Sequence, residues 1–353
     1  MSGGRLRVAV VGLGWVAREV WLPRLTGHPD FTVVAAVEPD PAAADRVRHL
    51  PAATPVYRQH TEVPDEVDAV FVLTPNHTHD TIAGWFLRRG TSVFLEKPTG
   101  TSPGQLDALE RAARAGAGRL VLSAAARYRR DVGALRQLVD DGALGTPRLA
   151  ELSWIRASGV PGSGWFTDRA TAGGGVLVDL GWHVLDVFHQ LWSPSPVTAA
   201  VAVAGHDFAG REEHAIDWRG HEERDARPVD VEDQLTALLT TDHYAAQLRF
   251  AWASHEEADR TVLTLHGTDA SLTLTTTFGF SPLRVATPSL VLRRNGTVRE
   301  IPLPAASVGE EYDRQLDALP DLFAAADPTG RSMREARDVL SVVTACYRAA
   351  GIG

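Results

Sequence analysis

The stretch Arg7-Val8-Ala9-Val10-Val11-Gly12-Leu13-Gly14-Trp15-Val16-Ala17 decides the fold of the first third of the chain. Its apolar run predicts a buried parallel strand, and residues 18–25 can continue as a helix. The Gly-x-Gly-x-x-Ala turn between them is typical of dinucleotide binding: Gly12 permits a tight turn, Gly14 lets a pyrophosphate approach the backbone, and Ala17 allows close packing. The N–H groups at the start of the helix would bind the phosphates. We therefore expect nucleotide contacts from Gly12, Leu13, Gly14, Trp15 and Val16.

An acidic residue follows the second predicted strand, which covers residues 31–37. Glu38 lies 24 residues after Gly14, close to the spacing of about 20 residues that is typical of a ribose-binding carboxylate. A carboxylate at this position accepts hydrogen bonds from the ribose hydroxyls and repels a 2′-phosphate. Because no arginine follows in Pro39-Asp40-Pro41, the sequence favours NAD over NADP.

Predicted strands and helices alternate through the rest of this region. Helices are expected at residues 41–49, 81–89 and 103–115, and strands at residues 68–73, 91–95 and 119–123. Strict alternation of this kind predicts a doubly wound parallel sheet.

Polar residues follow two of these strands, in Thr74-Pro75-Asn76-His77-Thr78-His79 and in Glu96-Lys97-Pro98. The carboxyl ends of parallel strands face the ligand crevice of an open α/β sheet. We therefore assign these positions to the cofactor side of the crevice: Thr74, Pro75, Asn76, His79, Glu96 and Lys97. The alternative for Lys97 is a surface lysine beside a turn proline.

The remainder of the chain has the pattern of a second α/β domain. Strands are expected at residues 149–156, 234–240, 245–252, 260–266 and 271–277, a hairpin turns at Asn295-Gly296, and helices are expected at residues 131–141, 310–326 and 333–350. Residues 178–192 carry a helical apolar stripe. Asp179 and His183 lie four positions apart on this helix, so both project from one face. An isolated pair of this kind can also be a local ion pair.

Composition and charge narrow the class of protein. Of the 353 residues, 44% are hydrophobic and 22% charged, which is typical of a soluble globular chain, and the net charge of -9 argues against a nucleic-acid or membrane-surface binder. No apolar run is long enough for a signal peptide or a membrane span, so we expect a cytoplasmic protein. The single cysteine, Cys346, excludes an internal disulfide and a multi-cysteine metal site. The histidines of the charged segment 206–230 lack metal-ligand spacing, so we expect no metal and a solvated insertion there.

Taken together, these motifs resemble the glucose–fructose oxidoreductase / inositol dehydrogenase (Gfo/Idh/MocA) family. The glycine turn, Thr74-Pro75-Asn76-His77-x-His79, Glu96-Lys97-Pro98 and the run from Gly173 to Asp186 carry the resemblance. It implies a Rossmann domain, residues 1–124, followed by a substrate and assembly domain, residues 125–353, with a large open-faced, mostly antiparallel sheet. It also implies a cis peptide bond before Pro98, and a homodimer or homotetramer formed through the open sheet.

The resemblance further implies the site residues. Lys97, Asp179 and His183 match the catalytic positions, and Arg127, Tyr128 and Trp165 would shape the substrate pocket. We expect the Trp165 indole to stack on the apolar face of a sugar ring. The alternative is that this side chain only packs against neighbouring protein side chains. Phe166 stands where family members often have arginine, so that contact does not carry over.

The resulting hypothesis is NAD-dependent hydride transfer at a secondary hydroxyl of a sugar, cyclitol or aminosugar-type polyol. His183 would act as general base, Lys97 would stabilise charge on the reacting oxygen, and Asp179 would orient neighbouring groups. Three alternatives stay open: a keto-sugar reductase of secondary metabolism, a redox-neutral NAD-dependent glycosidase, and a non-catalytic nucleotide-binding regulator. The substrate, the reacting carbon, the direction and the oligomer size are not defined by the sequence.

Overall fold

The computed structural model describes residues 4–45, 47–162, 164–215, 229–325 and 328–352. The chain folds into two compact units, the first made of Met1–Ala125 with Tyr312–Arg337 and the second of Ala126–Glu311 with Asp338–Gly353. Helix α8 (Glu310–Ala324) therefore belongs almost entirely to the first unit, and helix α9 (Pro328–Ala349) contributes residues to both. The expected functional division into residues 1–124 and 125–353 stays a prediction.

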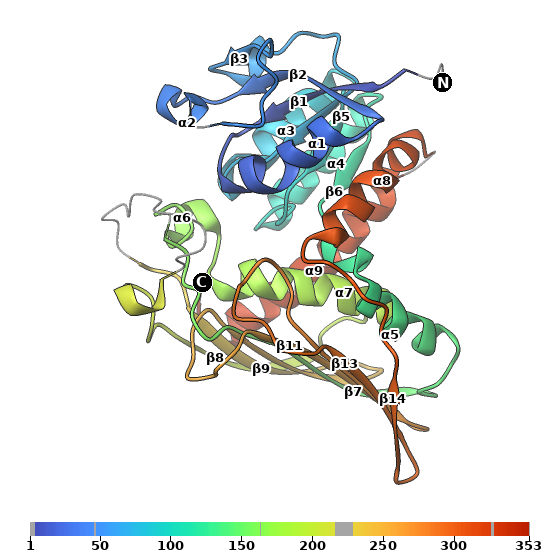
Figure 1. The fold of residues 1–353 in the computed structure, drawn as a ribbon. Coiled ribbons are helices and arrows are strands. Elements are labelled where there is room, and N and C mark those ends of the chain that lie inside the picture. Colours follow the sequence, from blue (N-terminus) through green and yellow to red (C-terminus); the bar gives the residue numbers. More distant parts are fainter. Residues whose placement is uncertain (1–3, 46, 163, 216–228, 326–327, 353) are drawn as a thin grey trace. The chain divides into compact units, whose positions relative to one another are not determined.

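The first unit contains the predicted doubly wound parallel sheet. Its six strands follow the order β3-β2-β1-β4-β5-β6, and all of their pairings are parallel (Figure 1). The strands are β1 (Leu6–Val11), β2 (Phe31–Val37), β3 (Val56–Tyr57), β4 (Ala69–Val72), β5 (Ser92–Leu95) and β6 (Leu120–Leu122). The order reverses between β1 and β4, which is where sheets of this kind bind their ligands.

The helices of this unit begin and end close to the predicted positions. A π-helical turn η1 (Val16–Trp21) leads into α1 (Leu22–Gly27), followed by α2 (Pro41–Asp45), α3 (His79–Arg88) and α4 (Pro103–Ala115), with short 3-10 turns η2 (His60–Glu62) and η3 (Asn76–Thr78). Gly90 ends α3 in the left-handed conformation with φ 84°. Helix α2 ends at Asp45 instead of reaching residue 49, because it has no buried residue to pack against the sheet.

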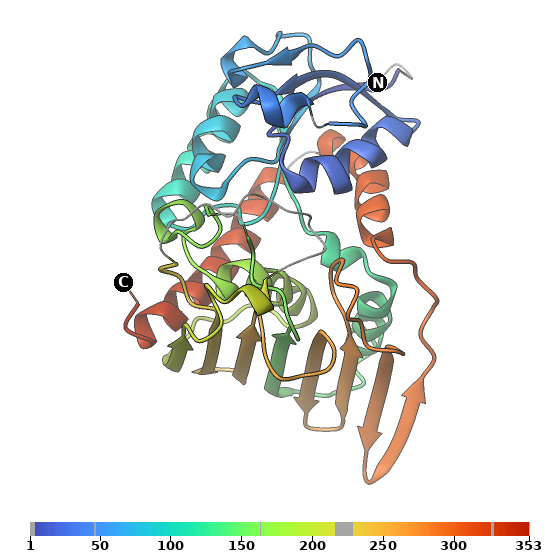
Figure 2. The same ribbon diagram turned by 60° about the vertical axis from the view of Figure 1, so that its left-hand side comes forward.

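The second unit contains an eight-stranded sheet in the order β14-β13-β12-β11-β7-β10-β9-β8, seen as a row of strands in Figure 2. Its pairings are antiparallel except for the parallel pair β10–β7, so the predicted mostly antiparallel sheet is confirmed. The strands are β7 (Pro147–Ile155), β8 (Ala199–Gly205), β9 (Gln234–Thr240), β10 (Ala245–Ala251), β11 (Arg260–Gly267), β12 (Ser271–Thr276), β13 (Ser289–Arg294) and β14 (Thr297–Ile301).

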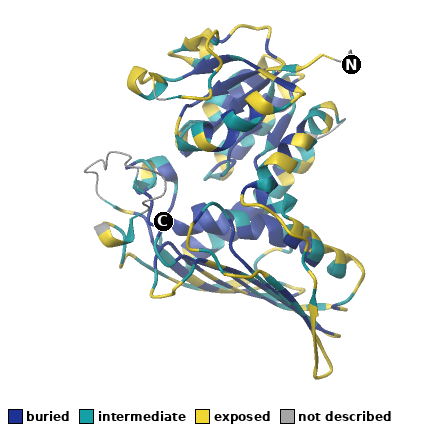
Figure 3. Cartoon of the chain, in the orientation of Figure 1, coloured by how far each residue is buried: buried dark blue, intermediate teal, exposed yellow. Residues whose placement is uncertain are grey.

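One face of this sheet is buried and the other is open. Helices α5 (Arg130–Asp140) and α7 (Trp182–Leu191) lie on the buried face, and most of α7 is coloured as buried in Figure 3. Alternate residues of β9 are buried and exposed, as expected for a half-buried strand. On the open face Val201 and Val203 are each 71% exposed. Assembly through this face stays a prediction.

The predicted Asn-Gly hairpin can be compared with the structure, whereas most of the charged segment 206–230 cannot. Asn295 and Gly296 both have positive φ, 49° and 76°, so the Asn-Gly hairpin is confirmed between β13 and β14. The centre of the charged segment, residues 216–228, lies outside the described residues, and only its flanks, including the short 3-10 turn η6 (Glu212–His214), are described.

None of the helices in the described residues combines the length and the apolar character needed to cross a membrane.

Candidate active site

The glycine turn after β1 has the geometry that a nucleotide cradle requires. Gly12 has φ 90°, and a Cβ atom there would lie 2.9 Å from the Leu73 carbonyl oxygen, so only glycine fits. A Cβ atom at Gly14 would meet no atom within 4 Å, so the space before this peptide is open. Ala17 is fully buried where the helix meets the sheet. The turn therefore fits a pyrophosphate, and its second glycine serves no packing need within the protein.

Glu38 lies against this turn. Its Oε2 accepts a hydrogen bond of 2.9 Å from the backbone N–H of Leu13, and its Oε1 accepts one of 3.1 Å from the N–H of Asp40. The carboxylate is thus held beside the glycine loop at the carboxyl end of β2, where a ribose-binding acid is needed.

His79 joins the two loops that follow β4 and β5. Its Nδ1 lies 2.8 Å from the carbonyl oxygen of Pro98, and its Nε2 lies 2.8 Å from that of Thr74. Burial lowers the pKa of His79, and the two carbonyl contacts oppose this shift. The ring therefore lies between the Lys97-Pro98 loop and the Thr74 loop, and in its neutral form it donates to one of the two carbonyls. Any cofactor contact by His79 stays a prediction.

Glu96 anchors the Glu-Lys-Pro motif from inside the protein. Its buried carboxylate accepts hydrogen bonds from Trp21 Nε1 at 2.8 Å, from Ser123 Oγ at 2.9 Å and from the backbone N–H of Lys97 at 2.9 Å. The Lys97–Pro98 peptide bond is cis, as the resemblance implied. These contacts hold the strand end at Lys97, and the assignment of Glu96 to the cofactor side stays a prediction.

Lys97 is also the only lysine in the chain, whose 35 basic residues are otherwise arginines. Arginine keeps its charge at any physiological pH and donates through a planar fork, while a lysine ammonium is a compact donor whose pKa responds to its surroundings. Lysine therefore stands at this one position, and arginine stands at every other basic position counted. This compositional signal supports a chemical role for Lys97.

In the second unit, Asp179 and His183 lie on a helix that opens with a π-helical turn. The turn η5 (Leu177–Gly181) continues directly into α7. A regular α-helix was expected here, and π-helical turns are rare and frequently occur at functional sites. Asp179 is 5% exposed and accepts a hydrogen bond of 2.9 Å from Trp252 Nε1. His183 is half-buried, with its ring centroid 6.0 Å from that of Trp154.

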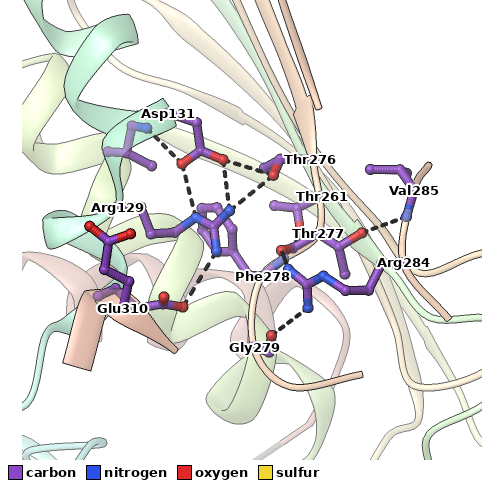
Figure 4. A network of polar contacts seen from close by, with 12 residues as sticks. Arg129, Asp131, Thr261, Thr276, Thr277, Phe278, Gly279, Arg284, Val285 and Glu310 are labelled. Atoms are coloured by element: carbon purple, nitrogen blue, oxygen red, sulfur yellow. Dashed lines mark hydrogen bonds and ion pairs between the residues drawn. The ribbon is translucent and has the colours of Figure 1, made fainter. Parts of the chain in front are cut away.

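A network of polar contacts lies around Phe278 (Figure 4). The Phe278 ring lies 5.6 Å from Trp154 and carries the Arg129 guanidinium 4.7 Å above its own face. Arg129 contacts Asp131 at 2.7 Å and Thr276 at 3.0 Å, and Thr276 donates to Asp131 at 2.8 Å. In the same loop, Arg284 donates to the carbonyl oxygens of Thr277 and Gly279. The ionic network therefore holds the Phe278 ring, and Phe278 in turn packs against Trp154.

The predicted substrate residues differ in their surroundings. Arg127 lies on a short 3-10 turn (Ala125–Tyr128), and its Nε donates to Asp186 on α7 at 2.6 Å, with a second contact through Nη2. Tyr128 and Trp165 are half-buried, and Trp165 packs on Phe166 with ring centroids 4.4 Å apart. Asp186, on the same helix as His183, is therefore the partner of Arg127.

Sequence patterns did not identify Trp252, Trp154, Phe278 or the buried Glu232. None of these residues belongs to a local motif, because each acts through contacts with distant parts of the chain. Within the described part of the chain, no cluster of three or more His, Cys, Asp or Glu side chains could hold a metal ion.

Comparisons with known proteins agree with this geometry. The model of the "Oxidoreductase family, NAD-binding Rossmann fold" matches residues 6–123, and that of the "GFO/IDH/MocA C-terminal domain" matches residues 132–273. The chain is 42% identical over 351 residues to a putative UDP-kanosamine synthase oxidoreductase subunit from Amycolatopsis mediterranei, covering 98% of this chain and 96% of that protein.

Two further proteins extend the comparison. The chain is 30% identical to dTDP-3,4-didehydro-2,6-dideoxy-alpha-D-glucose 3-reductase from Streptomyces antibioticus, over 86% of this chain and 85% of that one. The fold of the present chain is similar to that of a 3-ketoreductase from Actinomadura kijaniata solved with NADP and TDP-benzene. The TM-score is 0.77, with 22% identity and 98% coverage of both chains.

Proposed function

Because the chain belongs to the Gfo/Idh/MocA oxidoreductase family, we propose that it transfers a hydride between NAD and a secondary hydroxyl of a nucleotide-linked hexose. The observation that carries this proposal is the 42% identity, across both units, to an oxidoreductase subunit of a UDP-kanosamine synthase. The retained Lys97, Asp179 and His183 support turnover over a purely regulatory role.

The names of the relatives narrow the substrate class within the broader hypothesis of a sugar or polyol. One relative is named for a UDP-linked aminosugar and the other for a dTDP-linked keto-hexose. A nucleoside diphosphate hexose is common to both. The name of the second relative specifies position 3, and we propose the same ring position for this enzyme.

The cofactor residues proposed here are those of the glycine turn together with Glu38, whose geometry fits a dinucleotide. When bound, the nicotinamide supplies the hydride chemistry. Glu38 favours NAD over NADP, because its carboxylate would repel a 2′-phosphate.

Each catalytic residue is proposed to have a separate task. An imidazole nitrogen of His183 takes the proton of the reacting hydroxyl. Lys97 Nζ donates a hydrogen bond to the same oxygen and stabilises the negative charge that develops on it. Asp179, oriented by Trp252, binds and orients a neighbouring group of the sugar.

A keto-sugar reductase is the second candidate. The 3-reductase name of the 30% identical relative favours it. The same residues serve in this direction, with His183 returning a proton to the oxygen that Lys97 polarises.

The test is turnover of a panel of UDP- and dTDP-hexoses and their 3-keto forms with NAD and NADP in both directions, followed by mass spectrometry. We expect Lys97→Ala, Lys97→Arg and His183→Ala to lose most of the rate. The exposed His243 provides the matched control His243→Ala, which should retain it. Wild-type rates in the Lys97→Arg and His183→Ala variants would refute the assigned roles.

A further inference from the structure

Glu232 is a fully buried carboxylate to which no task has yet been assigned. It lies at 0% exposure just before β9, where burial raises its pKa. Its Oε1 accepts hydrogen bonds from the N–H groups of Gly175 and Leu177, both at 3.1 Å, and from the Tyr347 hydroxyl at 2.7 Å. Its Oε2 lies 3.1 Å from the Gly175 nitrogen and 3.8 Å from Arg169. Burying a carboxylate is costly without such partners.

These partners are at the start of the helix that carries Asp179 and His183. The first N–H groups of a helix have no acceptor within the helix, and a negative charge there also complements the helix dipole. Glu232 supplies both, from the segment just before β9 and 57 residues further along the chain than Gly175.

The three consecutive glycines before this helix are explained by the same contacts. Gly173 ends α6 (Arg169–Ala172) with φ 81°. A Cβ atom at Gly174 would lie 2.1 Å from the Tyr347 hydroxyl, and one at Gly175 would lie 1.9 Å from the Glu232 carbonyl oxygen. The glycine run therefore lets Glu232 and Tyr347 approach the helix backbone closely.

A single residue, Gly175, links Glu232 to Asp179 through its N–H and its carbonyl group. The N–H of Gly175 donates to Glu232, and the carbonyl of Gly175 accepts a 3.0 Å hydrogen bond from the N–H of Asp179. A 3.0 Å bond from the Val176 N–H to the Glu232 carbonyl adds a second link. The backbone that carries Asp179 is thus fixed by Glu232, while Trp252 fixes its carboxylate.

We propose that Glu232, held by the Tyr347 hydroxyl, is a positioning residue for hydride transfer that sets the Asp179 backbone and the start of the helix bearing His183. This inference rests on the proposed function. Misplacement of reacting groups by about 1 Å can cost roughly 100-fold in rate. Loss of the contact should therefore slow the chemical step. Nucleotide affinity should be unchanged, because the glycine turn and Glu38 belong to the first unit.

The test compares Glu232→Gln and Tyr347→Phe with the wild type and with Tyr244→Phe. Tyr244 is also buried and packs on Phe188 near the far end of the same helix, so its variant is a matched control. Single-turnover hydride-transfer rate constants, NAD dissociation constants and exchange of the Gly175 and Leu177 amides are measured. A single-turnover rate constant does not depend on the fraction of folded enzyme, so it separates positioning from simple loss of stability.

We expect a rate constant roughly 10- to 100-fold lower in Glu232→Gln and a smaller loss in Tyr347→Phe, with unchanged NAD affinity and faster exchange at both amides. The double variant should be less than additive, because both changes affect one contact. A wild-type rate constant in either folded variant overturns the inference, and Tyr347→Phe decides alone if Glu232→Gln does not fold. If the wild type transfers no hydride, the proposed function fails, and unchanged amide exchange in the variants overturns the role of Glu232 separately.

Discussion

Trp252 donates its indole N–H to the carboxylate of Asp179 at 2.9 Å, and both side chains are buried. The donor comes from the residue that follows β10, and the acceptor lies 73 residues earlier on the π-helical turn. A carboxylate that is fixed in this way has little freedom to turn, so the pair sets the orientation that the proposed sugar contact of Asp179 would require.

Removing this donor should impair both catalysis and folding. Trp252→Phe keeps most of the ring but deletes the N–H, so we expect kcat to fall about tenfold and the free energy of unfolding to fall by about 1–3 kcal/mol. Steady-state kinetics and urea unfolding provide the two measurements. Trp192→Phe, which changes another buried tryptophan near the far end of α7, is the control. An unchanged kcat in Trp252→Phe would show that Asp179 needs no such orientation.

Glu38 should determine the choice between the two nucleotides. Glu38→Gln removes the negative charge beside the ribose site, so we expect weaker NAD binding and a smaller penalty for NADP. Dissociation constants for both nucleotides, measured by calorimetry, check this expectation. The exposed Asp45 on α2 provides Asp45→Asn as a control for the general loss of one negative charge. A wild-type enzyme that prefers NADP would contradict the role of Glu38.

His79 should make the stability of the protein sensitive to acid. Because burial lowers its pKa in the folded state, the unfolded chain binds the proton more readily. The stabilisation is present above about pH 6.5 and is lost as the pH falls towards the folded-state value, with a slope of up to about 1.4 kcal/mol per pH unit.

Unfolding free energies at several pH values should therefore fall less steeply on acidification in His79→Gln than in the wild type. The exposed neighbour His77 gives the control His77→Gln, which should keep the wild-type slope. Parallel slopes for the wild type and His79→Gln would rule out His79 as the source of the effect.

Asp131 should be a major source of stability for the second unit. Burial alone would raise its pKa, but the charge and hydrogen bonds of Arg129 lower it overall. Asp131→Asn leaves a buried guanidinium with a weaker partner, so we expect a loss of about 3–5 kcal/mol. Its contribution should be present above about pH 4 and lost as the pH falls through the lowered pKa. Urea unfolding measures the loss, and Asp141→Asn, at an exposed position, is the control. If Asp131→Asn loses no more stability than Asp141→Asn, the role of Asp131 is contradicted.

The sequence predicted those features that depend on local patterns. The bounds of β2, β9 and α4 agree with the structure because hydrophobic periodicity and glycine or proline signals define them within a few residues. The glycine turn and the Asn-Gly hairpin are likewise local. Helix α2 was predicted too long because alanines favour a helix, yet no residue of it reaches the core.

Contacts between distant residues could not be predicted in this way. The bond from Tyr347 to Glu232 spans 115 residues, and the bond from Trp252 to Asp179 spans 73. No spacing rule links such positions, and in the sequence Glu232 looks like any acidic residue next to a strand. The π-helical turn was also missed, because the apolar stripe of residues 178–192 fits a regular α-helix equally well.

The most direct test of the central claim is transfer of deuterium from the ring carbon at position 3 of a UDP-hexose to the nicotinamide. The labelled sugar nucleotide is incubated with enzyme and NAD, and the nucleotide is analysed by mass spectrometry. We predict reduced NAD that carries the deuterium, and none with Lys97→Ala. Label that remains on the sugar, or that appears only in water, for every UDP- and dTDP-hexose tried would contradict the proposed hydride transfer.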